Sequence, residues 1–374
     1  MARARIFVLI LLSLLLLTGC WDRLEVEERV PVLSIGIDMA EDGELIISIA
    51  VPDVLGLAGG PQAAPEKKQP IVIAAKAKNL TTAFEQLHSM LAREVFLGYV
   101  RVLVISEEVA FKRDINEVLD GFRRSAQFRP LAYMIITPDK PEDIIAVAPA
   151  EATLPITYLY RMIDNEIRKQ WLLDTYMHNF TIPYRNQGIE PVLVSIKYLE
   201  DRLSIAGLSA FKRDRLAGSL NNEELSDFLR IKGLLGKSIE SPCNLHPDEI
   251  LVVSPIQIKT KTRVETNHAG RITAKINIKL TVEIIEKNPD RAHLGKEHVF
   301  EEYLAKVFEN RTNNLIKKIQ HDFQSDIIGI GLYVRAYYPD YWKQINWDEY
   351  FPYIPIEVSF DVTLSNERLL IDLE

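Results

Sequence analysis

The sequence predicts an α+β fold: a multi-domain ectodomain of mixed α/β structure that ends in an antiparallel sheet packed on a long helix. Strand and helix patterns alternate through the first 200 residues, which is typical of a central sheet with helices on its faces. Beyond residue 200, alternation of apolar and polar side chains dominates, as in strands with one packed and one solvated face. Residues 301–323 instead repeat their apolar side chains at helical spacing.

The first half opens with a predicted hairpin. Residues 30–38 and 45–51 are rich in apolar and β-branched side chains, and the turn-forming residues 41–44 separate them. In residues 79–95 the apolar side chains recur at intervals of four, three and four residues, which predicts an amphipathic helix. The other elements expected here are a loop at 52–70, strands at 99–106, 131–137 and 192–199, and helices at 114–123 and 156–171.

The second half begins with a further predicted hairpin at residues 203–220, turning at Lys212-Arg213-Asp214. Asn221 follows as a helix cap, and Glu224 stands three residues on as the partner in a capping box. Seven apolar side chains alternate with polar ones across residues 271–285, so we expect one dry face, covered by the helix at 301–323. The other parts of this expected sheet are strands at 256–266 and 356–364 and a hairpin turn at 267–270.

We place the main domain boundary near residue 200, where the pattern changes from alternating helices and strands to mostly strands. A chain of 374 residues is long enough for two or three domains. Residues 1–19 are expected to form a leader, 20–200 an N-terminal α/β domain and 201–374 a C-terminal domain of antiparallel sheet plus helices. A further division of the first domain near residue 150 is the alternative.

The first twenty residues have the pattern of an export signal. Arg3 and Arg5 precede an apolar run of about 12 residues, whereas a membrane-spanning helix needs about 20. Small residues then lead to Gly19 and Cys20, and Leu17-Thr18-Gly19-Cys20 resembles the bacterial lipobox. That resemblance implies cleavage between Gly19 and Cys20 and an S-diacylglyceryl group on the Cys20 thiol, with N-acylation of the same residue as an option. The alternatives are an ordinary signal peptide with a chance cysteine and an uncleaved anchor.

A lipid on Cys20 would be sufficient to hold the protein at a membrane. One fatty chain gives marginal binding, whereas two give stable anchoring without a spanning helix. Removing residues 1–19 takes away two of the 44 basic residues and none of the 52 acidic ones, so the formal net charge goes from −8 to −10. This balance argues against nucleic acid or anionic lipid as the main partner. Cys243 is the second of two cysteines, so with Cys20 acylated no internal disulfide can form.

The usual signatures of catalysis are missing from the sequence. It has no Gly-x-Ser-x-Gly elbow and no phosphate-binding loop, and its seven histidines are scattered. His293 and His298 lie five residues apart, a weak metal pair. Cys243 is better interpreted as a small packed residue than as a nucleophile. Three carboxylate pairs fit helix-end electrostatics or solvation better than acid–base catalysis: Glu107-Glu108, Glu223-Glu224 and Glu301-Glu302. We therefore expect no catalytic residue, no metal and no cofactor.

Aromatic residues are concentrated in a short stretch near the C-terminus. Interface hot spots favour Trp and Tyr, so this cluster is either core and corner packing beside the long helix or an exposed patch for a protein partner. The sequence leaves both interpretations open. The cluster comprises Tyr333, Tyr337, Tyr338, Tyr341, Trp342, Trp347, Tyr350, Phe351 and Tyr353.

Several sequence blocks, taken together in their order, carry a family resemblance. They are residues 19–23 (Gly-Cys-Trp-Asp-Arg), 35–38 (Ile-Gly-Ile-Asp), 97–105, 207–212 with 215–218, 326–331 (Asp-Ile-Ile-Gly-Ile-Gly) and 347–352 (Trp-Asp-Glu-Tyr-Phe-Pro). The blocks extend over almost the whole chain and resemble the Ger(x)C family, the lipoprotein C subunits of bacterial spore germinant receptors. Residues 125–128 (Ser-Ala-Gln-Phe) depart from it, because that segment commonly contains Asp-Pro-Glu.

The resemblance implies a non-enzymatic subunit that is needed for germination in response to nutrients. Such proteins lie on the outer face of the spore inner membrane and associate with two integral-membrane partners, the A and B subunits. Their ectodomain is a mixed α/β assembly of three domains. Cys20 is the one functional residue that the resemblance carries over. Two other functions stay open: a lipid-anchored binding protein that holds a small molecule between domains, and a surface hydrolase, which the missing motifs disfavour.

Overall fold

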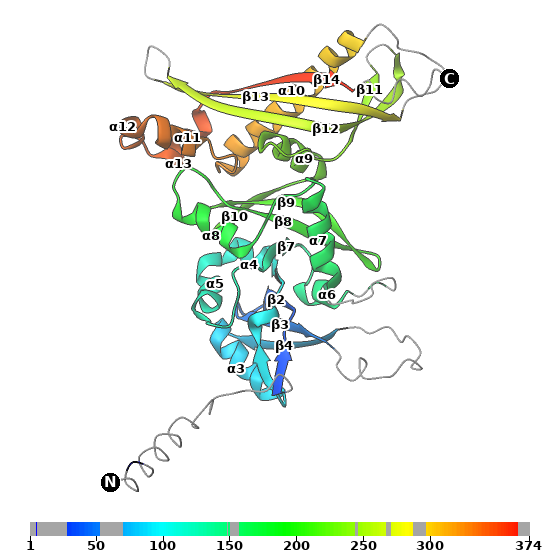
Figure 1. Ribbon diagram of the computed structural model, residues 1–374. Helices are drawn as coiled ribbons and strands as arrows, with labels where there is room; N and C mark the ends of the chain where they lie inside the picture. The colour runs from blue at the N-terminus through cyan, green and yellow to red at the C-terminus, as the bar shows by residue number, and fades with distance from the viewer. Residues whose placement is uncertain are drawn as a thin grey trace.

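The computed structural model describes residues 5, 28–52, 70–147, 149, 157–243, 246–266, 271–286 and 297–365 of the chain. Two sheets account for most of it, one above the other in Figure 1. Apart from the isolated residue 5, the described chain begins at residue 28 beside the lower sheet, at the end of the molecule opposite the C-terminal sheet. A minor two-stranded parallel sheet, β1 (Arg29–Pro31) with β5 (Glu94–Phe96), lies near this start.

The lower sheet has eight strands in the order β10-β9-β8-β7-β6-β2-β3-β4. The four strands β2, β6, β7 and β8 run parallel, and antiparallel pairs extend the sheet on both sides. Every residue of β6 and β7 is buried, as expected for parallel strands covered on both faces. The strands are β2 (Ser34–Met39), β3 (Leu45–Val51), β4 (Ile71–Ala77), β6 (Val102–Ser106), β7 (Tyr133–Thr137), β8 (Val192–Leu199), β9 (Arg202–Lys212) and β10 (Arg215–Leu220).

Helices cover the two faces of this sheet. On one face α3 and α5 bury Leu87 and Leu119 against Ile35 and Ile49. On the other face α6 and α7 bury apolar side chains against Val104 and its neighbours. The helices are α3 (Leu80–Met90), α4 (Glu107–Lys112), α5 (Ile115–Arg124), α6 (Pro141–Ala146), α7 (Tyr158–Arg168) and α8 (Met177–Arg185).

The upper sheet has the order β11-β12-β13-β14, and the long helix α10 packs on its dry face. In β13 the buried residues alternate with more exposed ones through most of the strand. Its elements are α9 (Asn222–Ile231), β11 (Ile239–Cys243), β12 (His246–Thr266), β13 (Ile272–Glu286), α10 (Glu297–Lys317), a π-helical turn (Lys318–Phe323), α11 (Ile330–Tyr337), α12 (Pro339–Trp342), α13 (Trp347–Tyr350), a 3₁₀ turn (Phe351–Tyr353) and β14 (Ile356–Leu364).

The α+β fold class and the long helix on the C-terminal sheet are confirmed, but several details were wrong. The C-terminal sheet is mixed, because β14 pairs parallel to β13. The chain crosses over through α10 between these strands, and such a crossover returns the chain in the same direction. The helix expected over 79–95 ends at Met90, and the strand expected from residue 99 begins at Val102. The pattern analysis also missed β4, α4, α6 and α8.

The eight-stranded sheet continues across residue 200. β8 ends at Leu199, and β9 and β10 extend the same sheet to Leu220. The chain therefore leaves this sheet about twenty residues beyond the predicted boundary, at the start of α9. A domain boundary near residue 200 stays a prediction, as does a division near residue 150.

The outer edge of β14 is protected by side chains from α10. Glu309 Oε1 accepts the Phe360 N–H at 3.0 Å, and Glu301 Oε1 accepts the Leu364 N–H at 2.8 Å. An uncovered strand edge is a template for pairing with other chains. The two carboxylates occupy donors that another strand would otherwise bind.

Replacing both Glu301 and Glu309 by alanine should therefore destabilise the protein and open this edge. We expect the unfolding free energy to fall by about 1–2 kcal/mol, since two charge-assisted hydrogen bonds are lost at a partly exposed edge. Denaturant melts measure the loss, and light scattering measures self-association. Glu302→Ala is the matched control, because the Glu302 side chain is 62% exposed and pairs with exposed His298. Equal behaviour of the double variant and the control would contradict this role.

Candidate functional site

Helix α9 lies at the junction between the two sheets and begins the site. It packs on β9 on one side and on α10 on the other. Its start is the predicted capping box: Asn221 Oδ1 accepts the N–H groups of Glu223 and Glu224, both at 2.9 Å, and Glu224 Oε2 accepts the Asn221 N–H at 2.8 Å. Lys318 Nζ, just beyond α10, donates to both Glu224 oxygens at 2.9 and 2.8 Å. The cap of α9 is thereby held to the end of α10.

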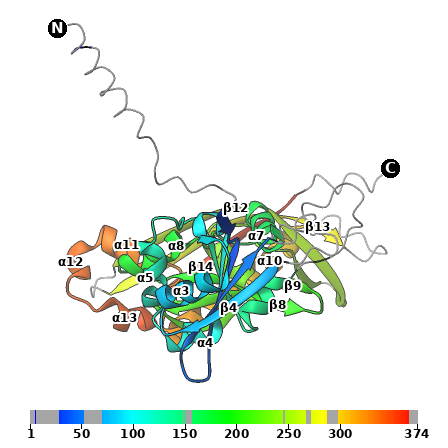
Figure 2. The ribbon, with the colours of Figure 1, turned by 90° about the horizontal axis from the view of Figure 1, so that it is seen from below.

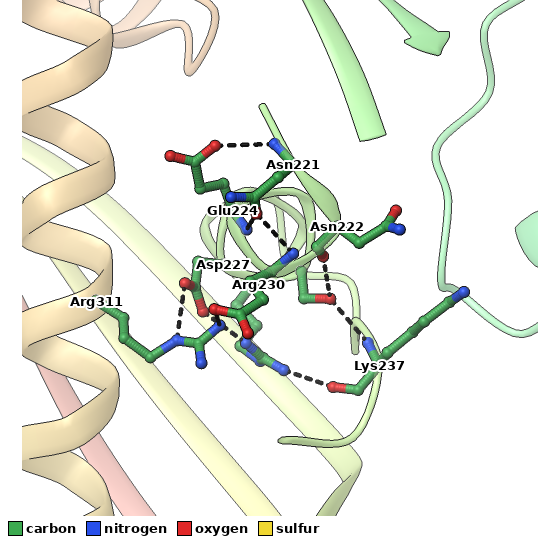
Figure 3. Close-up of polar contacts among 9 residues, drawn as sticks. Asn221, Asn222, Glu224, Asp227, Arg230, Lys237 and Arg311 are labelled. Carbon is green, nitrogen blue, oxygen red and sulfur yellow. Dashed lines mark hydrogen bonds and ion pairs between the residues drawn. The ribbon is translucent and has the colours of Figure 1, made fainter. Parts of the chain in front are cut away.

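A buried ion cluster connects the middle of the same two helices (Figure 3). Asp227 receives Arg230 Nη1 on one oxygen at 2.8 Å and Arg311 Nε on the other at 3.1 Å. Arg230 Nη2 donates to the Lys237 carbonyl at 2.7 Å, and its guanidinium lies 4.9 Å from the centre of the Phe308 ring. Burial raises the pKa of Asp227 and lowers the pKa of Arg230 to about 10, and each opposite charge counteracts the shift of the other. Removing Asp227 would leave the fully buried Arg230 charge without its carboxylate partner in the core.

A second buried carboxylate, Asp326, is held by N–H groups. Its oxygens accept the backbone N–H of Gly329, Ile330 and Gly331 at 2.8, 3.0 and 2.7 Å and the Trp347 Nε1–H at 3.0 Å. Burial raises the pKa of Asp326 to about 6, and these four donors act against the rise. Lys232 Nζ donates to the nearby Ile328 carbonyl at 3.3 Å; burial lowers the pKa of Lys232, and the charge of Asp326 acts against that change.

Glycine is required at two positions of this turn. Gly329 has φ of 82°, in the left-handed region that favours glycine. A Cβ on Gly331 would stand 2.5 Å from the Cα of Gly188 and 2.6 Å from Nε1 of Trp347. The block at residues 326–331 therefore forms a turn in which backbone N–H groups bind the side chain of its own first residue, Asp326. Trp347, from the block at residues 347–352, supplies the fourth donor.

The tip of the β9–β10 hairpin is fixed to the same region through Arg213. Its φ of 59° is left-handed, its N–H donates to Glu190 at 2.7 Å, and its Nη2 donates to Asp348 at 2.7 Å. Burial raises the pKa of Glu190 to about 7, and the Arg213 N–H counteracts part of that. The Glu190 N–H in turn donates to the Asp326 carbonyl at 2.9 Å, so the hairpin tip and the Asp326 turn share one network.

A surface groove of about 1160 Å³ opens beside this network. Its lining combines three basic residues from the hairpin tip with one acidic residue of the π-helical turn and two of α13, and it includes Tyr353, which is 81% exposed. Its lining is Lys212, Arg213, Arg215, Leu216, Ala217, Asp322, Phe323, Gln324, Asn346, Asp348, Glu349, Pro352 and Tyr353. The groove therefore brings together two sequence blocks more than 100 residues apart, 207–218 and 347–352.

The structure describes only some of the residues that the sequence singled out. Gly19, Cys20 and His293 lie outside the described residues, as does the side chain of Cys243. Of the carboxylate pairs, Glu107 and Glu108 occupy the first turn of α4, and burial raises the pKa of Glu107. Glu224 is the capping residue of α9, and Glu301 caps the edge of β14. Structural roles account for these members of the pairs.

The aromatic cluster is mainly packing. Trp347 and Phe351 are buried, and Trp342 packs on Trp347 with ring centres 5.4 Å apart. Tyr337 and Tyr353 are the exceptions, with 69% and 81% of their surface exposed. Packing therefore explains most of the cluster, and two tyrosines remain available to a partner.

Sequence reasoning missed Asp227, Arg230 and Asp326 as organising residues. Asp326 begins the block at residues 326–331, and glycines follow it three and five residues later. This spacing could have indicated a turn that folds around a carboxylate. Asp227 and Arg230 have the i, i+3 spacing of a helical ion pair, but such pairs are common on solvated faces. Nothing in the local pattern indicated that this one is buried.

Among the described residues, no group of three or more His, Cys, Asp or Glu side chains is arranged to hold a metal ion. In the same part of the chain, no helix is both long and apolar enough to cross a membrane.

Comparisons with known proteins agree on one family. Residues 22–198 match a model described as the spore germination protein N-terminal domain, and residues 206–367 match one described as spore germination B3/GerAC like, C-terminal. Among curated proteins of Bacillus subtilis (strain 168), spore germination protein KC is 24% identical, over 97% of this chain and 95% of its own length. Spore germination proteins B3 and A3 are 20% and 23% identical, over 94% and 93% of this chain and 94% of their own lengths in each case.

A solved structure shares the fold. The crystal structure of the GerBC protein aligns with a TM-score of 0.58 at 16% identity, covering 88% of this chain and 96% of that chain. The sequence comparisons therefore identify the family, and the structural comparison shows a shared fold.

Asp326→Asn should lower stability and change its pH dependence. The folded-state pKa of Asp326, about 6, lies above the ordinary value of 3.8, so the folded chain keeps a proton that the unfolded chain releases between these values. Stability contributed by this group therefore rises as pH falls from 7 towards 4. We expect a loss of about 3 kcal/mol at pH 7.5 and a gap between parent and variant that widens by about 1–2 kcal/mol at pH 5. Denaturant melts across this range measure it.

Asp322→Asn is the control, because Asp322 is exposed at the groove and makes none of these bonds. Its stability should follow the parent at every pH. A parallel pH dependence of parent and Asp326→Asn would contradict the assignment.

Proposed function

The chain belongs to the Ger(x)C family of spore germination proteins, and from this premise we propose that it is the membrane-anchored lipoprotein subunit of a nutrient germinant receptor. The observation that carries the proposal is the order of features along the chain. A lipobox-like Leu-Thr-Gly-Cys ends at Cys20, and the two family matches follow from residue 22 and residue 206. A role in spore germination follows from the family, and the anchor and the receptor are the proposed refinements.

Anchoring through Cys20 rests on chemistry. The thiol is the acceptor that a diacylglyceryl transfer needs, and two fatty chains suffice for stable membrane attachment. Arg29 of β1 is nine positions beyond Cys20 in the sequence, a reach of about 30 Å for extended chain. The eight-stranded sheet would then stand close to the membrane at the end where the described chain begins, with the C-terminal sheet farther out.

The proposed role is non-enzymatic. The protein would lie on the outer face of the spore inner membrane and associate there with the integral-membrane A and B subunits. The buried carboxylates of the junction support this interpretation, because Asp227 and Asp326 are both fully engaged in internal contacts. Neither is free for acid–base chemistry on a substrate.

Cys20→Ala should release the protein from membranes and impair the nutrient response of spores. Fractionation followed by immunoblotting measures release, and intact-mass spectrometry of the parent should show residue 20 as the first residue with two or three fatty acyl groups. Cys243→Ala is the matched control, since it removes the other cysteine and should leave both membrane association and germination unchanged. A Cys20→Ala protein that stayed with the membrane, or a parent with a free thiol or a retained leader, would contradict the anchor.

The groove favours a second candidate function, a lipid-anchored binding protein for a small nutrient. A free amino acid carries one ammonium and one carboxylate, and the groove offers acidic residues such as Glu349 and basic residues such as Arg215. The groove is open to solvent, whereas most small-molecule sites enclose their ligand. This openness counts against the second candidate.

If the second candidate holds, a germinant amino acid at millimolar concentration should raise the melting temperature of the purified full-length protein. A ligand at 100 times its Kd adds about 2.7 kcal/mol of stability. Arg215→Ala should remove the shift, whereas Lys259→Ala, an exposed cation on the C-terminal sheet, should keep it. An unchanged melting temperature in the parent would exclude this function at the tested concentrations.

A further inference from the structure

The two edges of the eight-stranded sheet are treated differently. β10 forms one edge, and the C-terminal half of the chain covers it: Lys318 Nζ donates to the Ser219 carbonyl at 3.1 Å, and the Phe323 ring packs on Gly218. β4 forms the other edge, with seven residues in unbroken register on β3 and no proline. Figure 1 shows β4 at the lower end of the molecule, and Figure 2, seen from below, shows it near the viewer.

The register identifies which backbone groups of β4 point outward. The Ala50 carbonyl of β3 accepts the Leu33 N–H at 3.1 Å, and the Glu44 carbonyl accepts the Ala40 N–H at 2.8 Å, so the even-numbered residues of β3 direct their backbone groups to the β2 side. Successive residues of a strand alternate, and the odd-numbered residues of β3 therefore bond to β4. Their partners are Ile71, Ile73, Ala75 and Ala77.

It follows that Val72, Ala74 and Lys76 direct their N–H and C=O groups away from the sheet. Within the described part of the chain, no hydrogen bond reaches these outward groups. Lysine often guards an edge against pairing, but the Lys76 ammonium is bound to Asp42 in the β2–β3 turn, on the side away from the opening. By contrast, carboxylates cap the outer edge of β14. Among the residues that the structure describes, side chains reach the edges of β10 and β14, whereas none bonds to the outward groups of β4.

We propose that β4 accepts an extended segment of an integral-membrane partner as a ninth strand of this sheet. Main-chain hydrogen bonds from Val72, Ala74 and Lys76 would supply affinity, as in other cases of strand addition. On the sheet face that carries α3, apolar side chains at alternate positions of the added strand would pack against Ile71 and Ile73. Ile71 is exposed and Ile73 is half-buried. On the other face, beside α6, the small Ala74 leaves room for a second set of side chains.

The position of the edge selects this occupant. β4 and the start of the described chain lie at the same end of the molecule, and about 30 Å of extended chain at most separates Arg29 from Cys20. This step rests on the proposed function, because it takes the membrane from the anchor at Cys20. A partner embedded in that membrane reaches this end with short segments outside the bilayer, whereas the β10 edge and the C-terminal sheet face away from it.

The test uses proline substitutions at two adjacent residues of β4 in the full-length chain, co-expressed with the A and B subunits. Ala74→Pro removes an outward N–H and leaves the bonds to β3, and edge strands tolerate proline at such positions. We expect a melting temperature close to the parent's and at least a tenfold loss of co-purified A or B subunit. Ala75→Pro removes an N–H that bonds to β3 and should lower the melting temperature instead.

Amide hydrogen exchange gives a readout that needs no variant. In the partner-free chain the amides of Val72, Ala74 and Lys76 should exchange fast, and those of Ile73 and Ala75 slowly. Adding the partner should slow the hydrogen exchange of the amides of Val72, Ala74 and Lys76. Full capture by Ala74→Pro, or outward amides that stay fast in the complex, would overturn the proposal. Protection that rises with protein concentration without partner would overturn it in favour of a second copy. A parent that captures neither subunit would instead refute the proposed function.

Discussion

The buried carboxylate of Asp326 is the interaction on which the junction depends. Taking an unpaired carboxylate out of water is prohibitively costly, so the chain must supply donors wherever it buries one. Here three backbone N–H groups and the Trp347 indole provide them, and each bond fixes a different piece of chain. The carboxylate positions the turn after the π-helix and the start of α13. The backbone carbonyl of the same residue binds the Glu190 N–H, and Glu190 and Asp348 hold the tip of the β9–β10 hairpin through Arg213.

Asp227 is also a buried carboxylate, but its partners are the side chains of two arginines and not backbone N–H groups. Backbone donors around Asp326 organise a local turn, whereas Arg230 and Arg311 come from two helices, so Asp227 joins α9 to α10. Both carboxylates lie where the eight-stranded sheet meets the C-terminal sheet. A single apolar cluster runs through the same region, from Tyr133 and Leu208 to Phe308 and Val362. The two sheets therefore share one core, and the polar networks determine how that core is aligned.

The sequence predicted the elements whose side chains alternate regularly, and it failed where tertiary contacts decide. The alternation of β13 and the Asn221–Glu224 capping box needed no other information, since each is local. The parallel direction of β14 depends on where α10 crosses the sheet, and the helix expected to reach residue 95 ends at Met90 because the following residues pair with β1. The resemblance blocks include residues that line the groove, but they did not predict it, because the groove and the burial of Asp326 and Asp227 arise only when distant segments meet.

The two ends of the molecule differ in how their strand edges are covered. At the junction, even the strained Arg213 backbone has a partner for its N–H, and the exposed edges of β10 and β14 are covered by side chains. At the opposite end, the outward groups of β4 have no partner within the described residues, although the strand is regular and its neighbours belong to a buried apolar cluster. An uncovered edge promotes unwanted pairing, and proteins usually protect one. Among the described residues, the edges of β10 and β14 are reached by side chains and β4, near the proposed anchor, is not, which is better explained by a strand that is supplied from outside than by incomplete folding.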